Sequence, residues 1–215
     1  MKSKCLVAFL LIFNIQFVWA SPMCPLPFFT PTNYFGHAFG GAEALTEYRH
    51  ARSGEDYVFE YIEYQTSDPV YKSVYLVDIL SSEDGSYRVN LGRLAKKAPA
   101  GATDAPEFTY RAIDIAISNR LVKAVTPILL RTHYSPVPQE FGCVDGFVIQ
   151  VLLESPGYGD LVADAYNPSD ESEAGSVVNL GRALKKFVLG QVEESAVDAA
   201  LTDVESHSKH GVDAK

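Results

Sequence analysis

VNLGRLAKK, at residues 89–97, recurs almost unchanged as VNLGRALKK at residues 178–186. The similarity continues downstream, where AIDIAI at residues 112–117 matches AVDAAL at residues 196–201. One short match is easily accidental, but two matches in the same order favour an internal duplication. The repeated stretch therefore predicts that the chain contains two copies of one structural plan.

Three strand-like runs precede each copy of the repeated stretch. They combine β-branched and aromatic residues with alternation or short apolar runs, and turn-forming residues bound them. Before the first copy they are ALTEYRHAR (44–52), YVFEYIEYQ (57–65) and VYKSVYLVDIL (70–80). Before the second copy they are PILLRTHYS (127–135), GFVIQVLLE (146–154) and LVADAYN (161–167).

Helices are predicted after each set of strands, with Asn90 and Asn179 capping the first turn after each motif. A further helix of the first copy should begin near DAPE (104–107), where Pro106 suits a first turn, and Pro127 should end or kink it. Residues 113–117 also alternate as a strand would. Apolar positions at helical spacing are Ile113, Ile117, Leu121 and Val125, then Leu180, Leu184, Phe187 and Val188 before Gly190, then Val192, Ala196, Val197, Ala200, Leu201 and Val204.

The predicted fold class is α+β, with tandem duplicated βββαα units that form antiparallel sheets covered by helices and are related by a pseudo-twofold axis. The expected divisions are a signal peptide (1–20), a proline-rich and aromatic arm (21–41), repeat units at 42–127 and 128–207, and a frayed tail (208–215). Each unit has a small core by itself, so we expect the two to form one compact domain.

The first twenty residues have the features of a secretory signal peptide. Lys2 and Lys4 precede a mainly apolar run that ends in Ala20, which predicts cleavage before Ser21. A retained membrane anchor is the alternative, but the run is shorter than the about 20 residues that span a bilayer. We therefore expect an exported protein, periplasmic or secreted, with no membrane span after cleavage.

The net charge and the cysteines limit the partners and the cysteine chemistry that we expect of this protein. Cleavage would change the formal charge from −9 to −11, and such a field repels nucleic acid. Cys5 would leave with the signal, so that Cys24 and Cys143 form an even pair, which predicts a disulfide in an exported chain. The alternative is a nucleophilic Cys143 with a histidine as its base.

The basic residues of the repeated stretch are weak candidates for an anion site. Arg93, Lys96 and Lys97, and in the second copy Arg182, Lys185 and Lys186, would share a helical face. In the other interpretation, Gly92 and Gly181 allow close packing on the sheet and the basic side chains are solvated.

The acidic loops SSEDG (81–85) and NPSDESEAG (167–175) lack EF-hand spacing, so solvated loops are favoured over calcium sites, and no metal or cofactor is expected.

Two further sets of residues are candidates for function. His50 and His133, with Glu47, would form a weak catalytic site if they met across the pseudo-twofold axis. Four tyrosines, Tyr57, Tyr61, Tyr71 and Tyr75, suggest an aromatic binding patch, although one alternate set would equally serve as core.

The function expected from the sequence is binding. We expect an exported, acidic, non-catalytic protein that engages a protein or cell-envelope partner. The alternative is a periplasmic or secreted hydrolase with its site in the groove between the two repeats.

Overall fold

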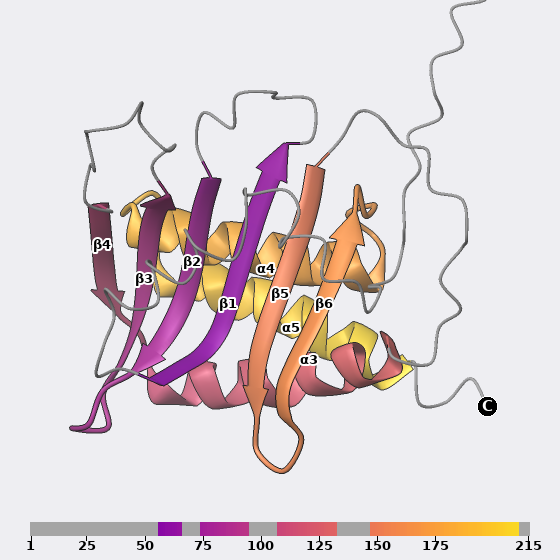
Figure 1. Ribbon diagram of the computed structural model, residues 1–215, viewed down its shortest axis with the longest axis horizontal. Coiled ribbons are helices and arrows are strands. Elements are labelled where there is room, and N and C mark those ends of the chain that lie inside the picture. The colour runs from indigo at the N-terminus through magenta and orange to yellow at the C-terminus, as the bar shows by residue number, and fades with distance from the viewer. Residues whose placement is uncertain (1–55, 66–73, 95–106, 133–146, 211–215) are drawn as a thin grey trace, which may run out of the picture.

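The computed structural model describes residues 56–65, 74–94, 107–132 and 147–210, in which one antiparallel sheet packs against three helices (Figure 1). This confirms the α+β class. The six strands are β1 (Asp56–Gln65), β2 (Val74–Ser81), β3 (Tyr87–Leu94), β4 (Glu107–Ala112), β5 (Phe147–Ser155) and β6 (Gly159–Tyr166). The three helices are α3 (Ile115–Thr132), α4 (Glu173–Val188) and α5 (Glu194–His210).

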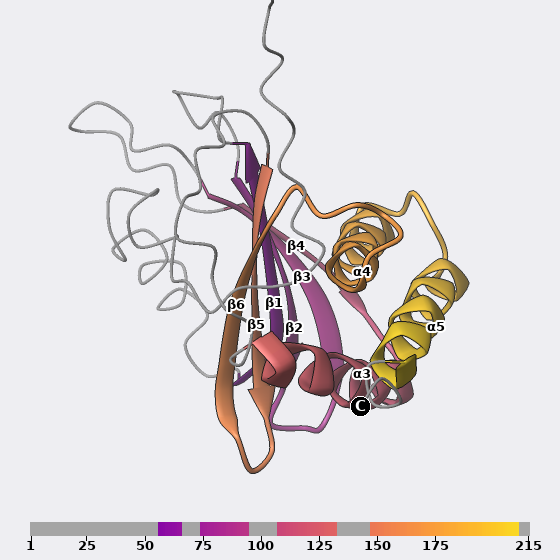
Figure 2. The same cartoon turned by 90° about the vertical axis from the view of Figure 1, so that its right-hand side faces the viewer.

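The sheet joins both halves of the chain. Its strand order is β4-β3-β2-β1-β5-β6, so the central strand β1 pairs with β2 on one side and with β5 on the other. Figure 2 shows all three helices on the same face of this sheet. In the described part of the chain, no helix is long and apolar enough to cross a membrane.

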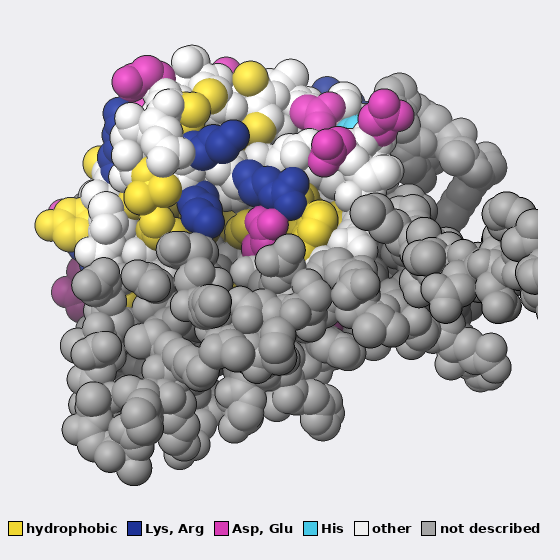
Figure 3. Space-filling model, turned by 90° about the horizontal axis from the view of Figure 1, so that it is seen from above, with side chains coloured by type: hydrophobic (Ala, Val, Ile, Leu, Met, Phe, Trp, Pro, Cys, Tyr) yellow, Lys and Arg dark blue, Asp and Glu magenta, His cyan; other side chains and the backbone are white. Residues whose placement is uncertain are grey.

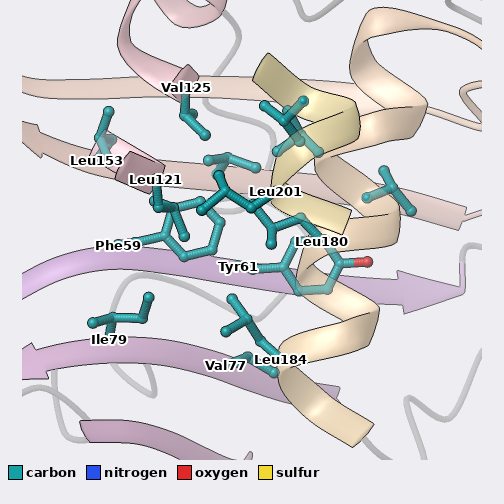
Figure 4. Close-up of a cluster of buried hydrophobic side chains, with 14 of the residues drawn as sticks. Phe59, Tyr61, Val77, Ile79, Leu121, Val125, Leu153, Leu180, Leu184 and Leu201 are labelled. Atoms are coloured by element: carbon teal, nitrogen blue, oxygen red, sulfur yellow. The ribbon is translucent and has the colours of Figure 1, made fainter. Parts of the chain in front are cut away.

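The core lies between the sheet and the helices. Phe59 and Tyr61 on β1 alternate with residues of the other face, and both point toward the helices (Figure 4). Leu121 and Val125 of α3 and Leu180 of α4 meet them at helical spacing. Burying such a side chain stabilises the fold by about 1.5–3 kcal/mol. The alternating apolar positions therefore favour a strand, and the apolar positions at helical spacing favour a helix.

Several sequence-predicted elements are confirmed. The runs at 57–65, 146–154 and 161–167 form β1, β5 and β6, and the end of the run at 70–80 forms β2. Ile117, Leu121 and Val125 are buried on the inner face of α3, and Ile113 is buried just before this helix begins. The apolar set beginning at Leu180 is buried on the inner face of α4. Gly190, with φ +68°, follows α4 as the predicted stop.

The repeated stretch does not have one structure. The described part of its first copy, residues 89–94, lies in β3, whereas its second copy lies within α4. The prediction that Asn90 and Asn179 are helix caps is therefore wrong, since Asn90 pairs with Asp78 across two strands and Ser172 caps α4 by accepting the Gly175 N–H at 3.0 Å. The first copy is a strand because β3 pairs with β2 on one side and with β4 on the other. The second copy is helical because it lies within the helix that the Ser172 cap begins.

The order of the elements also differs from two βββαα units. Within the described ranges, four strands and α3 come first, and two strands with α4 and α5 follow. Residues 127–132, predicted as a strand, belong to α3, so the boundary at 127/128 divides a helix. Pro127 does not end α3, because Ala124, Val125, Ile128 and Leu129 keep an apolar face buried across it.

The remaining predicted segments fall partly outside the described residues. The signal peptide, the arm, the run at 44–52 and both Cys24 and Cys143 lie outside them. The predicted tail begins too early, because α5 continues to His210.

Candidate functional site

The predicted catalytic set cannot be placed. Glu47, His50 and His133 lie outside the described residues, as do Tyr71, Lys96 and Lys97. Tyr75 and Arg93 are backbone partners across β2 and β3, so Arg93 lies on a strand and not on the predicted helical face.

Tyr61 belongs to the core and not to an exposed aromatic patch. Its side chain is 1% exposed, and its hydroxyl donates a 2.7 Å hydrogen bond to Glu63. Burial, followed by the Glu63 charge, raises the pKa of Tyr61 well above its ordinary value. Tyr57, also on β1, is half-buried.

Arg182, predicted as an anion ligand, is already paired with Glu63. Its Nη2 and Nε donate to the two carboxylate oxygens at 2.9 and 3.2 Å, and its guanidinium lies 4.9 Å from the centroid of the Phe147 ring. Burial raises the pKa of Glu63, but the hydrogen bonds from Arg182 and Tyr61 outweigh it and lower the pKa overall. The ion pair therefore joins α4 to β1.

The glycine of the second copy has a packing role. A Cβ atom on Gly181 would lie 2.4 Å from the ring of Tyr61. Lys186 in the last turn of α4 is exposed, and Figure 3 shows Lys and Arg side chains gathered on this side of the molecule. Cations near the C-terminal end of a helix interact favourably with its dipole, so packing and helix electrostatics account for these residues.

The acidic loops are also structurally engaged. Asp84 accepts the Ser86 N–H at 2.9 Å, and hydrogen bonding from the Ser86 side chain, followed by that from its backbone, lowers the pKa of the Asp84 carboxyl. Glu173 pairs with Arg131 of α3 at 2.6 Å. Among the residues that the structure describes, no group of three or more His, Cys, Asp or Glu side chains could hold a metal ion.

A row of buried polar residues lies on the sheet face opposite the helices. Glu60 is paired with Asp78, and Asp78 with Asn90, across three neighbouring strands. On β5 and β6, Gln150 donates a 2.9 Å hydrogen bond to Asp164. All five are at most 4% exposed. Alternating polar positions in the strand runs were the signal for this row, which the sequence interpretation did not use.

The edge strand β4 is different, because four of its described side chains are exposed. Phe108, Thr109, Tyr110 and Ala112 all face solvent, with Tyr110 65% exposed. Arg88 of β3 lies over the Tyr110 ring at 4.9 Å from its centroid. In the described sheet, β4 pairs only with β3, and its other side is a sheet edge.

The backbone of β4 presents hydrogen-bonding groups at this edge. The N–H of Ile113 donates to the Tyr87 carbonyl at 3.1 Å, which fixes the side toward which residue 113 points. In an antiparallel strand, the N–H and C=O of alternate residues point to the same side. Thr109 and Arg111 therefore face β3. The residues whose backbone groups face away from β3 are Phe108, Tyr110 and Ala112.

Exposed apolar side chains gather around this strand. Of the five large hydrophobic residues that are exposed in the described ranges, Phe108 and Tyr110 lie on β4, Ile115 begins the following helix, and Leu189 follows α4. Figure 3 shows hydrophobic side chains at the margin of the molecule on this side. We call β4 with its flanking residues Ile115 and Leu189 the β4 edge.

Arg111 holds the β4 edge against the helices. Its Nη1 donates to the carbonyls of Phe187 and Val192 at 3.1 and 3.3 Å. These two residues lie on either side of Leu189 in the sequence. The Arg111 guanidinium stacks on the Phe187 ring at 4.1 Å and pairs with Glu193 at 3.1 Å. The edge is therefore anchored by Arg111 on its inner side, while the side chains of Phe108, Thr109 and Tyr110 are exposed.

The sequence interpretation missed the β4 edge because Pro106 was taken as the first turn of a helix. The signal for a strand was the short run FTY, in which aromatic and β-branched residues follow one another. Comparison of the chain with protein-family models, curated proteins and solved structures found no match.

Proposed function

We propose that this is an exported, non-catalytic binding protein that engages another protein at the β4 edge by strand addition. The observation that carries the proposal is that β4 is the edge strand of the described sheet and carries consecutive exposed residues, Phe108 to Tyr110. In strand addition, the main-chain hydrogen bonds supply affinity and the alternate side chains supply specificity.

The chemistry of the β4 edge favours a protein over a small molecule. Large apolar residues exposed together, such as Tyr110 and Leu189, are typical of protein interaction sites. An aromatic ring with a polar tip, as in Tyr110, is also enriched at such interfaces. A partner strand beside β4 would bury these side chains.

Export is supported by the signal-like features of residues 1–20. Its test is direct: in a host that secretes the protein, N-terminal sequencing should find Ser21 as the first residue. A mature chain that keeps Met1 would contradict the proposed export.

The binding proposal is tested with proline at position 110. Tyr110→Pro removes an N–H that faces away from β3, so the β3–β4 pairing should survive while strand addition is blocked. The control is Tyr110→Ala, which removes the same ring but keeps the N–H. Circular dichroism and thermal melting verify that both variants fold.

The readout is affinity capture from the native extracellular or periplasmic fraction, with the mature protein as bait and mass spectrometry of the bound proteins. We expect the wild type to capture specific partners. Tyr110→Ala should bind the same partners more weakly, and Tyr110→Pro should not bind them. An unchanged set of partners with folded Tyr110→Pro would refute the proposal.

A further inference from the structure

We propose that Tyr158 is a site of tyrosine sulfation, at which a transferase replaces the phenol proton with a sulfuryl group. Tyr158 is the fifth exposed large hydrophobic residue of the described ranges. It lies in the turn between β5 and β6, at the opposite side of the sheet from β4. The inference rests on the proposed export, because tyrosine sulfotransferases act on proteins in the secretory pathway, but it does not depend on the β4 edge.

The turn between β5 and β6 presents Tyr158 to solvent. Its N–H donates to the Ser155 carbonyl at 3.0 Å, with Pro156 and Gly157 at the two central positions. Proline followed by a glycine with φ +87° is the pattern of a type II turn. Figures 1 and 2 show this turn projecting past α3 at the end of the sheet. Tyr158 is 63% exposed, and within the described part of the chain nothing hydrogen-bonds to its hydroxyl, so an enzyme can reach the phenol oxygen.

The residues that flank Tyr158 are acidic. Glu154 and Asp160 are exposed and lie opposite each other across β5 and β6, on either side of the turn. Because side chains alternate along a strand, both carboxylates share the sheet face of the buried polar row, opposite the helices. The sequence contains no Lys or Arg between Arg131 and Arg182. The hydroxyl of Tyr158 is therefore offered from an acidic loop.

This acidic setting fits the chemistry of sulfuryl transfer. The donor is a nucleotide phosphosulfate, which carries several negative charges, so a transferase must bind it with basic side chains. The same basic field attracts an acidic substrate loop. In the transfer, the Tyr158 oxygen attacks the sulfur and forms an S–O bond, while the S–O bond to the donor phosphate breaks. The phenol proton passes to a base of the enzyme, and the nucleotide leaves without its sulfuryl group.

Tyr110 provides an internal comparison, because it is equally exposed but differently surrounded. It is 65% exposed, yet it lies within β4 and not in a turn. The guanidinium of Arg88 lies 4.9 Å from its ring centroid, and Arg111 follows it in the chain. These cations repel a basic enzyme surface. Exposure alone would make both tyrosines substrates, whereas exposure with acidic flanks selects Tyr158.

The first experiment treats the folded mature protein with a purified tyrosine sulfotransferase and its phosphosulfate donor, and maps the modified peptides by mass spectrometry. We expect one sulfuryl group on Tyr158 and none on Tyr110. The double variant Glu154→Gln and Asp160→Asn removes two exposed charges and should be modified about tenfold more slowly, because the enzyme loses its electrostatic attraction to the loop. An unmodified Tyr158, an equally modified Tyr110, or an unchanged rate in the double variant would overturn the proposal.

The second experiment analyses the protein secreted by an animal cell line. Tyr158 should carry a group with the mass of SO3 that survives phosphatase treatment, and Tyr158→Phe should lack it. A group that phosphatase removes would be phosphate and would contradict sulfation. A secreted chain without the group would refute the sulfation alone, whereas a chain retained in the cell with Met1 would refute the proposed export as well.

Discussion

Gly181 lies so close to the ring of Tyr61 that position 181 accepts no side chain unless the ring moves. The contact is between two core residues, one on α4 and one on the central strand. Overpacking in a close-packed interior costs about 1–3 kcal/mol, since neither backbone nor ring can yield freely. The glycine of the second copy is thus explained by packing, whatever the origin of the repetition.

Gly181→Ala is expected to lower the free energy of unfolding by about 1–3 kcal/mol, even though alanine favours helix more than glycine does. Urea denaturation followed by circular dichroism measures the change. In a Tyr61→Leu background the same substitution should cost much less, because the flat ring no longer lies against the helix. An equal cost in both backgrounds would show that the Tyr61 contact is not the cause.

The pairing of Glu63 with Arg182 should make stability depend on pH. Because the pKa of Glu63 is lowered in the folded protein from 4.5, its contribution is fully present above that value and is lost as the pH falls through the folded pKa. The wild type should therefore lose more stability than Glu63→Gln between pH 6 and pH 3. Parallel curves of unfolding free energy against pH for the two proteins would contradict this role of Glu63.

At the scale of elements, arginines join one helix to another and a strand to the helical layer. Arg120 of α3 pairs with Asp198 and Glu205 of α5, and the hydrogen bond from Arg120 lowers the pKa of Glu205. Arg111 performs the corresponding task for β4 by binding carbonyls at the end of α4. An edge strand with a single strand neighbour in the described sheet is thereby tied to the helical layer.

Arg111→Ala is expected to destabilise the protein by about 1–3 kcal/mol, because two carbonyls lose a charged donor and the Phe187 ring loses its stacking partner. The effect should be local: amide hydrogen exchange should increase in β4 and in the turn between α4 and α5. Lys123→Ala, at an exposed position of α3, is the control and should leave exchange unchanged. Uniformly faster exchange throughout the sheet would argue against a local anchor.

The sequence predicted the elements whose pattern reflects their own burial. The alternation of Phe59 and Tyr61 on β1 and the spacing of Leu180 and Leu184 on α4 depend on one apolar face each, which the sequence displays directly. The β4 edge escaped prediction because its side chains are exposed and Pro106 mimicked a helix start. The repeated stretch led to a wrong prediction because residues outside it decide its structure. Neighbouring strands decide that of the first copy, and the Ser172 cap begins the helix that contains the second.

At the scale of the whole molecule, one sheet contains strands from both halves of the chain. β1 lies between β2 and β5, and its residue Phe59 pairs with Ile79 on one side and with Leu153 on the other. Tyr61 is covered only when α4 is in place, as shown by its contact with Gly181. Neither half therefore has a complete core of its own.

Separate expression of residues 21–127 and 128–215 should consequently give two chains without cooperative unfolding transitions. Each fragment leaves one side of the central pair β1 and β5 open, and the cut also divides α3. Thermal denaturation by circular dichroism would test this. A sharp transition in either fragment would mean that one half folds independently.

The central position of β1 also has a consequence for the order of folding. Its second neighbour, β5, begins at Phe147, and the helices α4 and α5 that close the core come later still. Contacts between distant parts of a chain form slowly, because the intervening loop must first be closed. The N-terminal strands can therefore complete their packing only after nearly all of the chain has left the ribosome. If the protein is exported unfolded, as proposed above, this delay would keep the chain able to thread through a membrane channel until its last helix has passed.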